Sequence, residues 1–490
     1  MRSMNEKTGS TVKAFWNFWK AMYGAGVLAL SHAFWYLGNM WVGVAVYIAV
    51  SAVCIYSLVV LIRVKQRALR MGGQEDQLAT YPALAGFVLG KYGTVAVSVI
   101  VVVLELAFCT GWVIIISTNI TLIAKKPSEW QWTVALLSWP VLAALACIRF
   151  LKDLWFLSIF GLLVYLVGVM GSVYYYVLSG KETAIDFNGS TNWEKLPQFV
   201  GVTVYGMEAI LLCIPVEASM RQAQHAAKVI AGSTSLYALS AALFGGVGYA
   251  YGLGWCKHDK GNIVTDCLPD GALATTLRVA LVVAVAASFP VLLYPVNEIL
   301  EGLFLGCSSN AAAAVPHHAN SESVRLNAPA SSSYEHGAGQ VTSIERSTST
   351  SRNFDNLKRS VVRCLEVLLC CLVAAEVGPN FNQFANVIGA LLVPIAGFML
   401  PAVLDFALVE TSSKRCEQSK GANYGAFHEE PAHGSDVTVH TPGASVFNST
   451  AFYLCNRNRS WPQWLRGVLL FCFGVSVLAA GIYSLLQPSA

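Results

Sequence analysis

The stretch that decides the fold is Tyr23–Leu30, YGAGVLAL, which lies inside an apolar run from about Val12 to Leu37. If this run crosses a bilayer as a helix, Gly24 and Gly26 fall near its middle, and glycine costs about 1 kcal/mol relative to alanine inside a helix. Their i, i+2 spacing does not suit one packing face, although tight helix packing is the alternative explanation for two glycines. We therefore predict that the helix is broken here, which exposes bare backbone to a small ligand at mid-membrane.

The composition indicates a protein that crosses a membrane many times. Of the 490 residues, 55% are hydrophobic and 12% are charged, which is about half the charge of an average soluble domain. Apolar runs long enough to span a bilayer recur along the chain. Basic patches with interleaved aromatic residues are missing, so we expect no nucleic-acid partner. No set of residues indicates an enzyme or a metal site, and we expect no cofactor.

We predict an all-α polytopic membrane protein with eleven transmembrane helices. Residues 1–11 form an N-terminal tail, and 308–356 and 410–460 have the polar, low-complexity composition of disordered loops. The predicted spans are 12–37, 40–63, 94–124, 132–150, 153–179, 198–219, 230–254, 272–305, 360–377, 383–409 and 464–486.

The placement of basic residues predicts the orientation in the membrane. If the N-terminus and both long loops are cytoplasmic, that side holds most of the 32 Lys and Arg residues. An odd number of spans then places the C-terminus on the extracellular or lumenal side. On that side, Asn188-Gly-Ser is a candidate glycosylation site. Cys256 and Cys267 share a polar loop there and are candidates for a disulfide.

The spans also predict an internal repeat. Five spans, within 12–179, are followed by five more, within 198–409, and the eleventh is left over. Because five is odd, the second group starts on the opposite side of the membrane, so the two groups are inverted. The break in the first span predicts a break in the sixth. That span, Phe199–Met220, has Gly206 near its middle and Pro215 further on.

Six motifs in this order resemble those of the amino acid/auxin permease (AAAP) family, and in particular its proton-coupled amino acid transporter branch. They are GAGVLAL, ELAFCTGWVIIISTNI, CIRFLKDLWFLSIFG, YGMEAILLCIPVEASM, LLYPVNEILEGLF and IGALLVPIAGFMLPAVLDF. The resemblance departs from the family where its usual proline and aromatic residue are Ser31 and His32. It implies an APC-superfamily-like fold, a 5+5 inverted repeat with discontinuous helices 1 and 6 and an extra helix 11.

The resemblance also implies an amino acid substrate, and broken helices suit a zwitterion. The N–H groups at the start of a half-helix favour a carboxylate, and freed carbonyl groups favour an ammonium. For Cys109 and Trp112 the site is implied by the family alone, and core packing is the alternative. The predicted substrate-binding residues are Tyr23, Gly24, Ala25, Gly26, Val27, Cys109, Trp112, Tyr205, Gly206 and Met207.

Three titratable residues are candidates for carrying a coupling proton. A carboxylate at bilayer depth costs about 3 kcal/mol on insertion scales and rarely lacks a role. Glu208 is therefore predicted either to relay a proton or to tether the unwound segment by hydrogen bonds, and Glu105 also lies within a span. His32 titrates in a suitable range, although a lone histidine near a helix end is usually only hydrogen-bonded.

We expect a secondary active transporter of small amino acids that works by alternating access as a proton-coupled symporter. Sodium coupling stays open as an alternative. The membrane is the plasma membrane or a vacuolar or lysosomal membrane. A second hypothesis is a receptor that binds an amino acid without transporting it and signals through the long cytoplasmic loops. The sequence does not determine the oligomeric state.

Overall fold

The computed structural model describes residues 10–147, 189–252, 271–305, 338–410 and 461–486, with Val167, Met170, Gly171 and Tyr174 between the first two ranges. The regular elements in these ranges are helical. The principal helices are α1 (Thr11–Ala21), α2 (Ala25–Leu37), α3 (Met40–Arg70), α4 (Tyr81–Leu89), α5 (Lys91–Ile123), α6 (Trp130–Leu137), α7 (Trp139–Ala146), α9 (Leu196–Gly206), α10 (Ile210–Ser219), α11 (Ala226–Gly252), α12 (Ala272–Leu305), α13 (Ala338–Val377), α14 (Phe381–Pro394) and α17 (Trp461–Leu486).

Within the described residues, seven helical segments are long and apolar enough to cross a membrane. This confirms the predicted class, an all-helical membrane protein. The count of eleven spans stays a prediction, because the span at 153–179 lies almost entirely outside the described residues. The seven are Met40–Arg70, Lys91–Ile123, Trp193–Ser219, Ala223–Ala250, Ala272–Leu303, Phe381–Glu410 and Trp464–Leu486.

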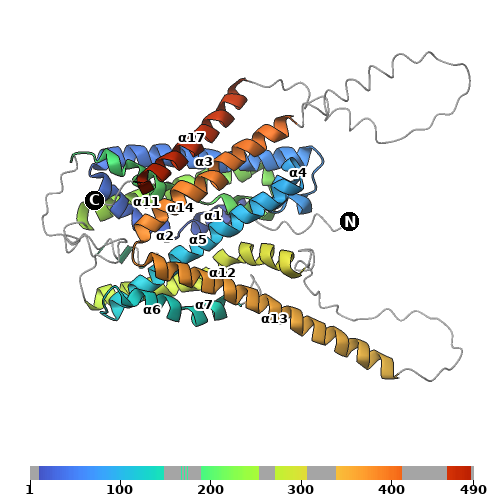
Figure 1. The fold of residues 1–490 in the computed structure, drawn as a ribbon. Helices are drawn as coiled ribbons and strands as arrows, with labels where there is room; N and C mark the ends of the chain where they lie inside the picture. The colour runs from blue at the N-terminus through green and yellow to red at the C-terminus, as the bar shows by residue number, and fades with distance from the viewer. Residues whose placement is uncertain are drawn as a thin grey trace, which may run out of the picture.

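The helices form a bundle in which α5 crosses between two groups (Figure 1). On one side α5 packs against α12, α13 and α6. On the other side α2 packs against α9 and α11, and α9 packs against α14. The last of these contacts is especially close, because a Cβ on Gly389 of α14 would overlap the carbonyl oxygen of Gly201 in α9. Small residues permit such backbone approach, which drives helix association in lipid.

Both predicted helix breaks are present. The first span is divided into α1 and α2, with residues 22–24 between them. The sixth span is divided into α9 and α10, with residues 207–209 between them. The sequence analysis placed the first break from its two glycines, which are costly inside a continuous helix. It placed the second as the counterpart of the first in the predicted repeat, with Gly206 and Pro215 in the span as support.

The tenth predicted span carries an interruption that the sequence analysis did not anticipate. After Pro394 the helix continues as a π-helix, η6 (Ile395–Met399). Proline lacks an N–H donor, and a π-bulge shifts the bonding pattern of the residues around it. Two side chains from other helices bond to carbonyl groups there: Tyr81 Oη donates to Ala396 O at 2.9 Å, and Ser57 Oγ donates to Gly397 O.

The polar segments differ in part from the prediction. Helix α13 begins at Ala338, inside the segment 308–356 predicted as a loop. Residues 338–356 contain no proline, so a helix that forms in the apolar residues beyond them propagates backward at little cost. The rest of that loop, almost all of 410–460, the tail 1–9, Asn188, Cys256 and Cys267 lie outside the described residues.

A buried ion pair ties two of the helices together. Lys65 of α3 and Glu217 of α10 contact each other with both side chains 2% exposed. Nearby, Arg67 pairs with Asp405 in the helical residues that follow η6, where the side chains are 31% and 19% exposed. Gln66 Nε2 also donates to Ala223 O at 2.9 Å. The end of α3 is therefore bound both to α10 and to the segment beyond η6.

We expect Glu217→Gln to destabilise the protein by about 3–5 kcal/mol, because it leaves the Lys65 charge buried without a partner. Asp405→Asn is the matched control and should cost much less, since its pair is partly exposed. The combined variant Lys65→Met, Glu217→Leu should recover most of the loss. Thermal unfolding of the purified protein in detergent measures all three. Equal melting temperatures for Glu217→Gln and wild type would contradict the account.

Candidate functional site

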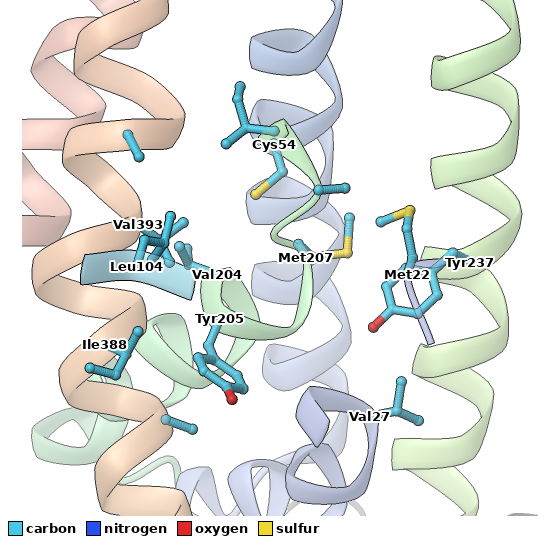
Figure 2. Close-up of a cluster of buried hydrophobic side chains, with 14 of the residues drawn as sticks. Met22, Val27, Cys54, Leu104, Val204, Tyr205, Met207, Tyr237, Ile388 and Val393 are labelled. Atoms are coloured by element: carbon cyan, nitrogen blue, oxygen red, sulfur yellow. The ribbon is translucent and has the colours of Figure 1, made fainter. Parts of the chain in front are cut away.

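The two helix breaks face each other across a small cavity. Its volume is about 80 Å³, and walls from α1, α2, α5, α9, α10 and α12 surround it. Buried side chains including Met22, Tyr205 and Met207 lie around the breaks (Figure 2). The cavity is lined by Ala21, Met22, Gly24, Gly26, Glu105, Phe108, Trp112, Tyr205, Gly206, Glu208, Ala209, Leu211, Leu212 and Leu292.

Because of the first break, helix α2 starts at the cavity. Gly24 is extended, with φ −141° and ψ −163°, and as a glycine it has no side chain of its own to cap the helix. The N–H groups in the first turn of a helix have no acceptor within the helix. They also carry the positive end of the helix dipole, so they bind anions. A carboxylate in the cavity would therefore meet favourable donors at the start of α2.

The two glycines of this break have different surroundings. A Cβ on Gly24 would lie 3.9 Å from the Trp112 ring, an ordinary contact distance. A Cβ on Gly26 would overlap Cα of Gly206 and lie 3.0 Å from its nitrogen. Gly26 thus lets the two broken helices touch, and Gly24 leaves space in the cavity. Close packing therefore explains Gly26, while Gly24 lines the cavity, where the predicted substrate site would lie.

The second break is held by hydrogen bonds from side chains. Tyr237 Oη of α11 donates to Gly206 O at 2.7 Å. The Glu208 carboxylate accepts from Ile210 N at 2.9 Å and 3.2 Å, so it caps α10. Tyr47 Oη donates to Met207 Sδ at 3.7 Å. Because a backbone group without a partner is costly inside a membrane, these bonds stabilise the interruption, and Glu208 does act as the predicted tether.

Helix α5 supplies the third wall. Glu105, Phe108 and Trp112 line the cavity, and their spacing of three and four residues puts them on one helical face. Glu105 is 4% exposed, and its Oε2 has no hydrogen-bond partner. Tyr205 Oη of α9 is also buried without a partner. The cavity thus contains polar atoms that a ligand can satisfy.

Seven of the predicted residues line the cavity, namely Gly24, Gly26, Glu105, Trp112, Tyr205, Gly206 and Glu208. Five described residues do not: Tyr23, Val27, Cys109, Met207 and His32. Ala25 begins α2 at the break, so only its backbone is placed there.

The five residues outside the cavity wall have identifiable places. Tyr23 stacks edge-on against Tyr237 at 5.3 Å between ring centres, and its hydroxyl lies 2.5 Å from Ser240 Oγ. Val27, Met207, Cys109 and His32 are all buried. Cys109, although one turn from Glu105 on α5, is fully buried and does not line the cavity. His32 is about two turns along α2 from the break. The binding roles of Tyr23, Val27, Cys109 and Met207 and the proton role of His32 therefore stay predictions that the cavity lining does not support.

The sequence analysis missed several cavity residues, of which Phe108 and Leu292 are the most informative. Phe108 was detectable, because it shares the helical face of Glu105 and Trp112. Leu292 lies between Pro290 and Pro295 in α12, and paired prolines in a span are a sign of local distortion. Leu211 and Leu212 follow the second break directly.

A larger groove of about 610 Å³ lies between α3 and α11. Its walls are almost entirely apolar, and Ile48, Leu239 and Leu243 at its edge are about 60% exposed. Such a surface suits contact with lipid and offers little to a charged solute. Among the described residues, no group of three His, Cys, Asp or Glu side chains is placed to hold a metal ion.

Two half-helices that meet end to end at a small, partly polar cavity in a helical membrane protein are typical of transporters. Comparison with known proteins agrees. The chain belongs to the transmembrane amino acid transporter (AAAP) family, whose sequence model matches residues 7–422. Membership of a transporter family also agrees with the expectation that the protein is not an enzyme.

Individual relatives are more distant. Amino acid transporter ANT1 of Arabidopsis thaliana is 25% identical over 425 residues, which cover 83% of this chain and 88% of the relative. Amino acid transporter AVT3C of Arabidopsis thaliana is 27% identical over 318 residues, or 60% of this chain and 71% of the relative. Among solved structures, MhsT in complex with L-phenylalanine has a TM-score of 0.48 at 11% identity, covering 96% of this chain and 97% of that one.

We expect Gly24→Ala to weaken amino acid binding by at least about tenfold without loss of stability. The added methyl group has room beside Trp112, but it occupies space in a cavity of only about 80 Å³. Gly26→Ala should instead destabilise the protein, because its methyl group overlaps the backbone of Gly206. Ligand-induced thermal shifts, read with the unliganded melting temperature, separate the two effects. A Gly24→Ala protein that binds as well as wild type would place the ligand elsewhere.

Proposed function

We propose that this protein carries small neutral amino acids across a membrane together with protons, by alternating access to the cavity between its two broken helices. The single observation that carries the proposal is the cavity itself, which combines the start of α2, with a glycine at its cap position, and two carboxyl groups. No observation in the described residues favours a receptor over a transporter.

The size of the cavity supports a small substrate. A bound water requires about 10–15 Å³ by the same kind of measure. A cavity of about 80 Å³ therefore holds roughly five to eight groups of that size. Glycine, alanine and serine fit this limit, whereas an aromatic amino acid requires Phe108, Trp112 or Leu292 to move.

The polar atoms support a zwitterion bound in one orientation. The substrate carboxylate would accept hydrogen bonds from the first N–H groups of α2 and from Tyr205 Oη, which is buried without another partner. The ammonium would lie on the side of Glu208 and Glu105, whose carboxyl groups face the same cavity. Charge complementarity at both ends of the substrate gives specificity for amino acids over neutral solutes.

The pair of carboxyl groups supports proton coupling. Glu105 and Glu208 lie close enough to interact electrostatically, and two negative charges in one small site repel each other. A proton and an ammonium group together neutralise both carboxylates, so substrate and proton favour each other's binding. This linkage is the requirement for symport. The histidine candidate, His32, lies outside the cavity wall and is not part of the proposal.

The wider arrangement belongs to the same proposal. The N-terminus is cytoplasmic and the C-terminus extracellular or lumenal, as the basic residues indicate, in the plasma membrane or a vacuolar or lysosomal membrane. The 5+5 inverted repeat would relate α1–α2 to α9–α10. Rocking of the broken helices, with the Gly26–Gly206 contact as the pivot, would expose the cavity to each side in turn.

Purified protein in liposomes tests the transport proposal. An imposed pH gradient should drive accumulation of labelled alanine, with glycine and serine as competitors and phenylalanine as a poor one. A gradient of one pH unit supports up to about tenfold accumulation for one proton per substrate. Absence of flux for any amino acid, in protein shown to be folded, would end the proposal.

Glu208→Gln separates the two roles of that residue. The glutamine side-chain oxygen can still accept from Ile210 N, so the cap on α10 is kept. We expect exchange of alanine at equal pH to persist and stimulation by the pH gradient to disappear. Glu194→Gln, at an exposed position before α9, is the matched control. Unchanged pH stimulation in Glu208→Gln would mean that Glu208 is only a tether.

A further inference from the structure

A buried carboxyl group on α13 is used by neither the cavity nor its hydrogen-bond supports. Glu366 is 5% exposed, and neither of its carboxylate oxygens has a hydrogen-bond partner. It lies within the predicted ninth span. A carboxylate in the membrane interior costs about 3 kcal/mol on insertion scales and usually marks a path for ions or protons.

On one side, Glu366 adjoins the helix that forms the cavity wall. Helix α13 packs against α5, and Cys370 Sγ of α13 donates to Leu106 O of α5 at 3.6 Å. Glu366 and Cys370 are one turn apart on one face of α13, and Glu105 and Cys109 are one turn apart on one face of α5. The carboxyl groups of Glu105 and Glu366 are both close enough to interact electrostatically with the Cys109 thiol. Glu366 therefore lies behind the cavity wall that Glu105 belongs to.

On the other side, Glu366 adjoins a cluster of charges at the end of α12. Arg363 donates to Glu301 from Nε at 2.9 Å and contacts it from Nη2 at 2.8 Å. Its Nη1 donates to Ala146 O at 3.1 Å, and Arg359 lies 3.6 Å from Glu301. The charged groups that interact electrostatically with the Glu366 carboxyl group are Arg363 and Glu301. Helices α6 and α7, which also pack on α13, contain no charged residue.

Glu301, Glu366 and Glu105 lie at increasing depths from the predicted cytoplasmic side. At about 1.5 Å per residue from the predicted cytoplasmic ends of their spans, Glu301 lies at about 6 Å, Glu366 at about 9 Å and Glu105 at about 17 Å. Glu366 is the intermediate step between the cavity wall and the cytoplasmic charge cluster. Glu366 and Glu105 differ by about 8 Å in this depth, so proton transfer between them would pass through bridging water.

We propose that Glu366 is a proton-relay residue that connects the substrate cavity to the cytoplasm. In the inward direction, the carboxylic acid of Glu105 gives its proton through water to the Glu366 carboxylate, which passes it to Glu301 or directly to water at the charge cluster. Each step moves one proton between two oxygen atoms and changes nothing else. The inference rests on the proposed proton coupling and adds the route that the proton takes.

The test compares Glu366→Gln with wild type in liposomes by two measurements. Exchange of labelled alanine at equal pH reports the substrate pathway, and alanine accumulation under a one-unit pH gradient reports proton coupling. We expect wild type to approach tenfold accumulation and Glu366→Gln to stay near onefold with exchange retained. Glu366→Asp should recover at least part of the accumulation and shift its pH profile. Glu376→Gln, an exposed change on the same helix, is the matched control and should behave as wild type.

Three results would overturn the relay. Full accumulation by Glu366→Gln would show that the proton takes another route, while the proposed function stands. Loss of exchange and accumulation together, with a lowered melting temperature and no recovery by Glu366→Asp, would make Glu366 structural. Exchange without pH stimulation in wild type would remove proton coupling itself, and with it the relay.

Discussion

The structure depends on one constraint, which is that a helix interrupted inside a membrane must satisfy its freed backbone groups without water. The second break meets this constraint internally: Tyr237 bonds to the carbonyl of Gly206, and Glu208 bonds to the N–H of Ile210. The first break does not meet it with a side-chain cap at the start of α2. The two breaks therefore differ: a neighbouring side chain, Glu208, caps the second, whereas the residue at the cap position of the first is a glycine. A substrate carboxylate at the start of α2 would accept hydrogen bonds from the first N–H groups of this helix. Substrate binding would therefore stabilise the first break.

The contact between the two breaks makes them one unit. Gly26 and Gly206 touch through their backbones, so neither broken helix can move toward the other without displacing it. Farther out, the buried pair of Lys65 and Glu217 binds α10 to α3. An opening motion that tilts α10 must either carry α3 along or separate this pair, and separation of a buried pair is costly. The proposed alternation between states would therefore require rigid-body movement of several helices together, which suits a small cavity whose walls come from six helices.

Much of this arrangement was predictable from residues that are energetically unfavourable inside a membrane-spanning helix for a known physical reason. Glycines in an apolar span located the first break, and the predicted repeat located the second. Glu105 and Glu208 were found because carboxyl groups at bilayer depth are rare. The sequence analysis failed where the answer depended on helix rotation. Cys109 was chosen on α5 in place of Phe108, one position earlier, because a motif does not determine which face turns inward. The bonds from Tyr81 and Ser57 to the π-helix and the relation of Glu366 to α5 join segments far apart in sequence, which no local pattern reveals.

The most direct test of the central claim is an experimental density map of the protein with bound alanine, at a resolution that shows the orientation of the ligand. The account predicts that α1 and α2 are separate, that the alanine carboxylate lies against the first N–H groups of α2, and that its ammonium faces Glu208. A continuous helix through Gly24 and Gly26, or alanine bound away from both breaks, would contradict it.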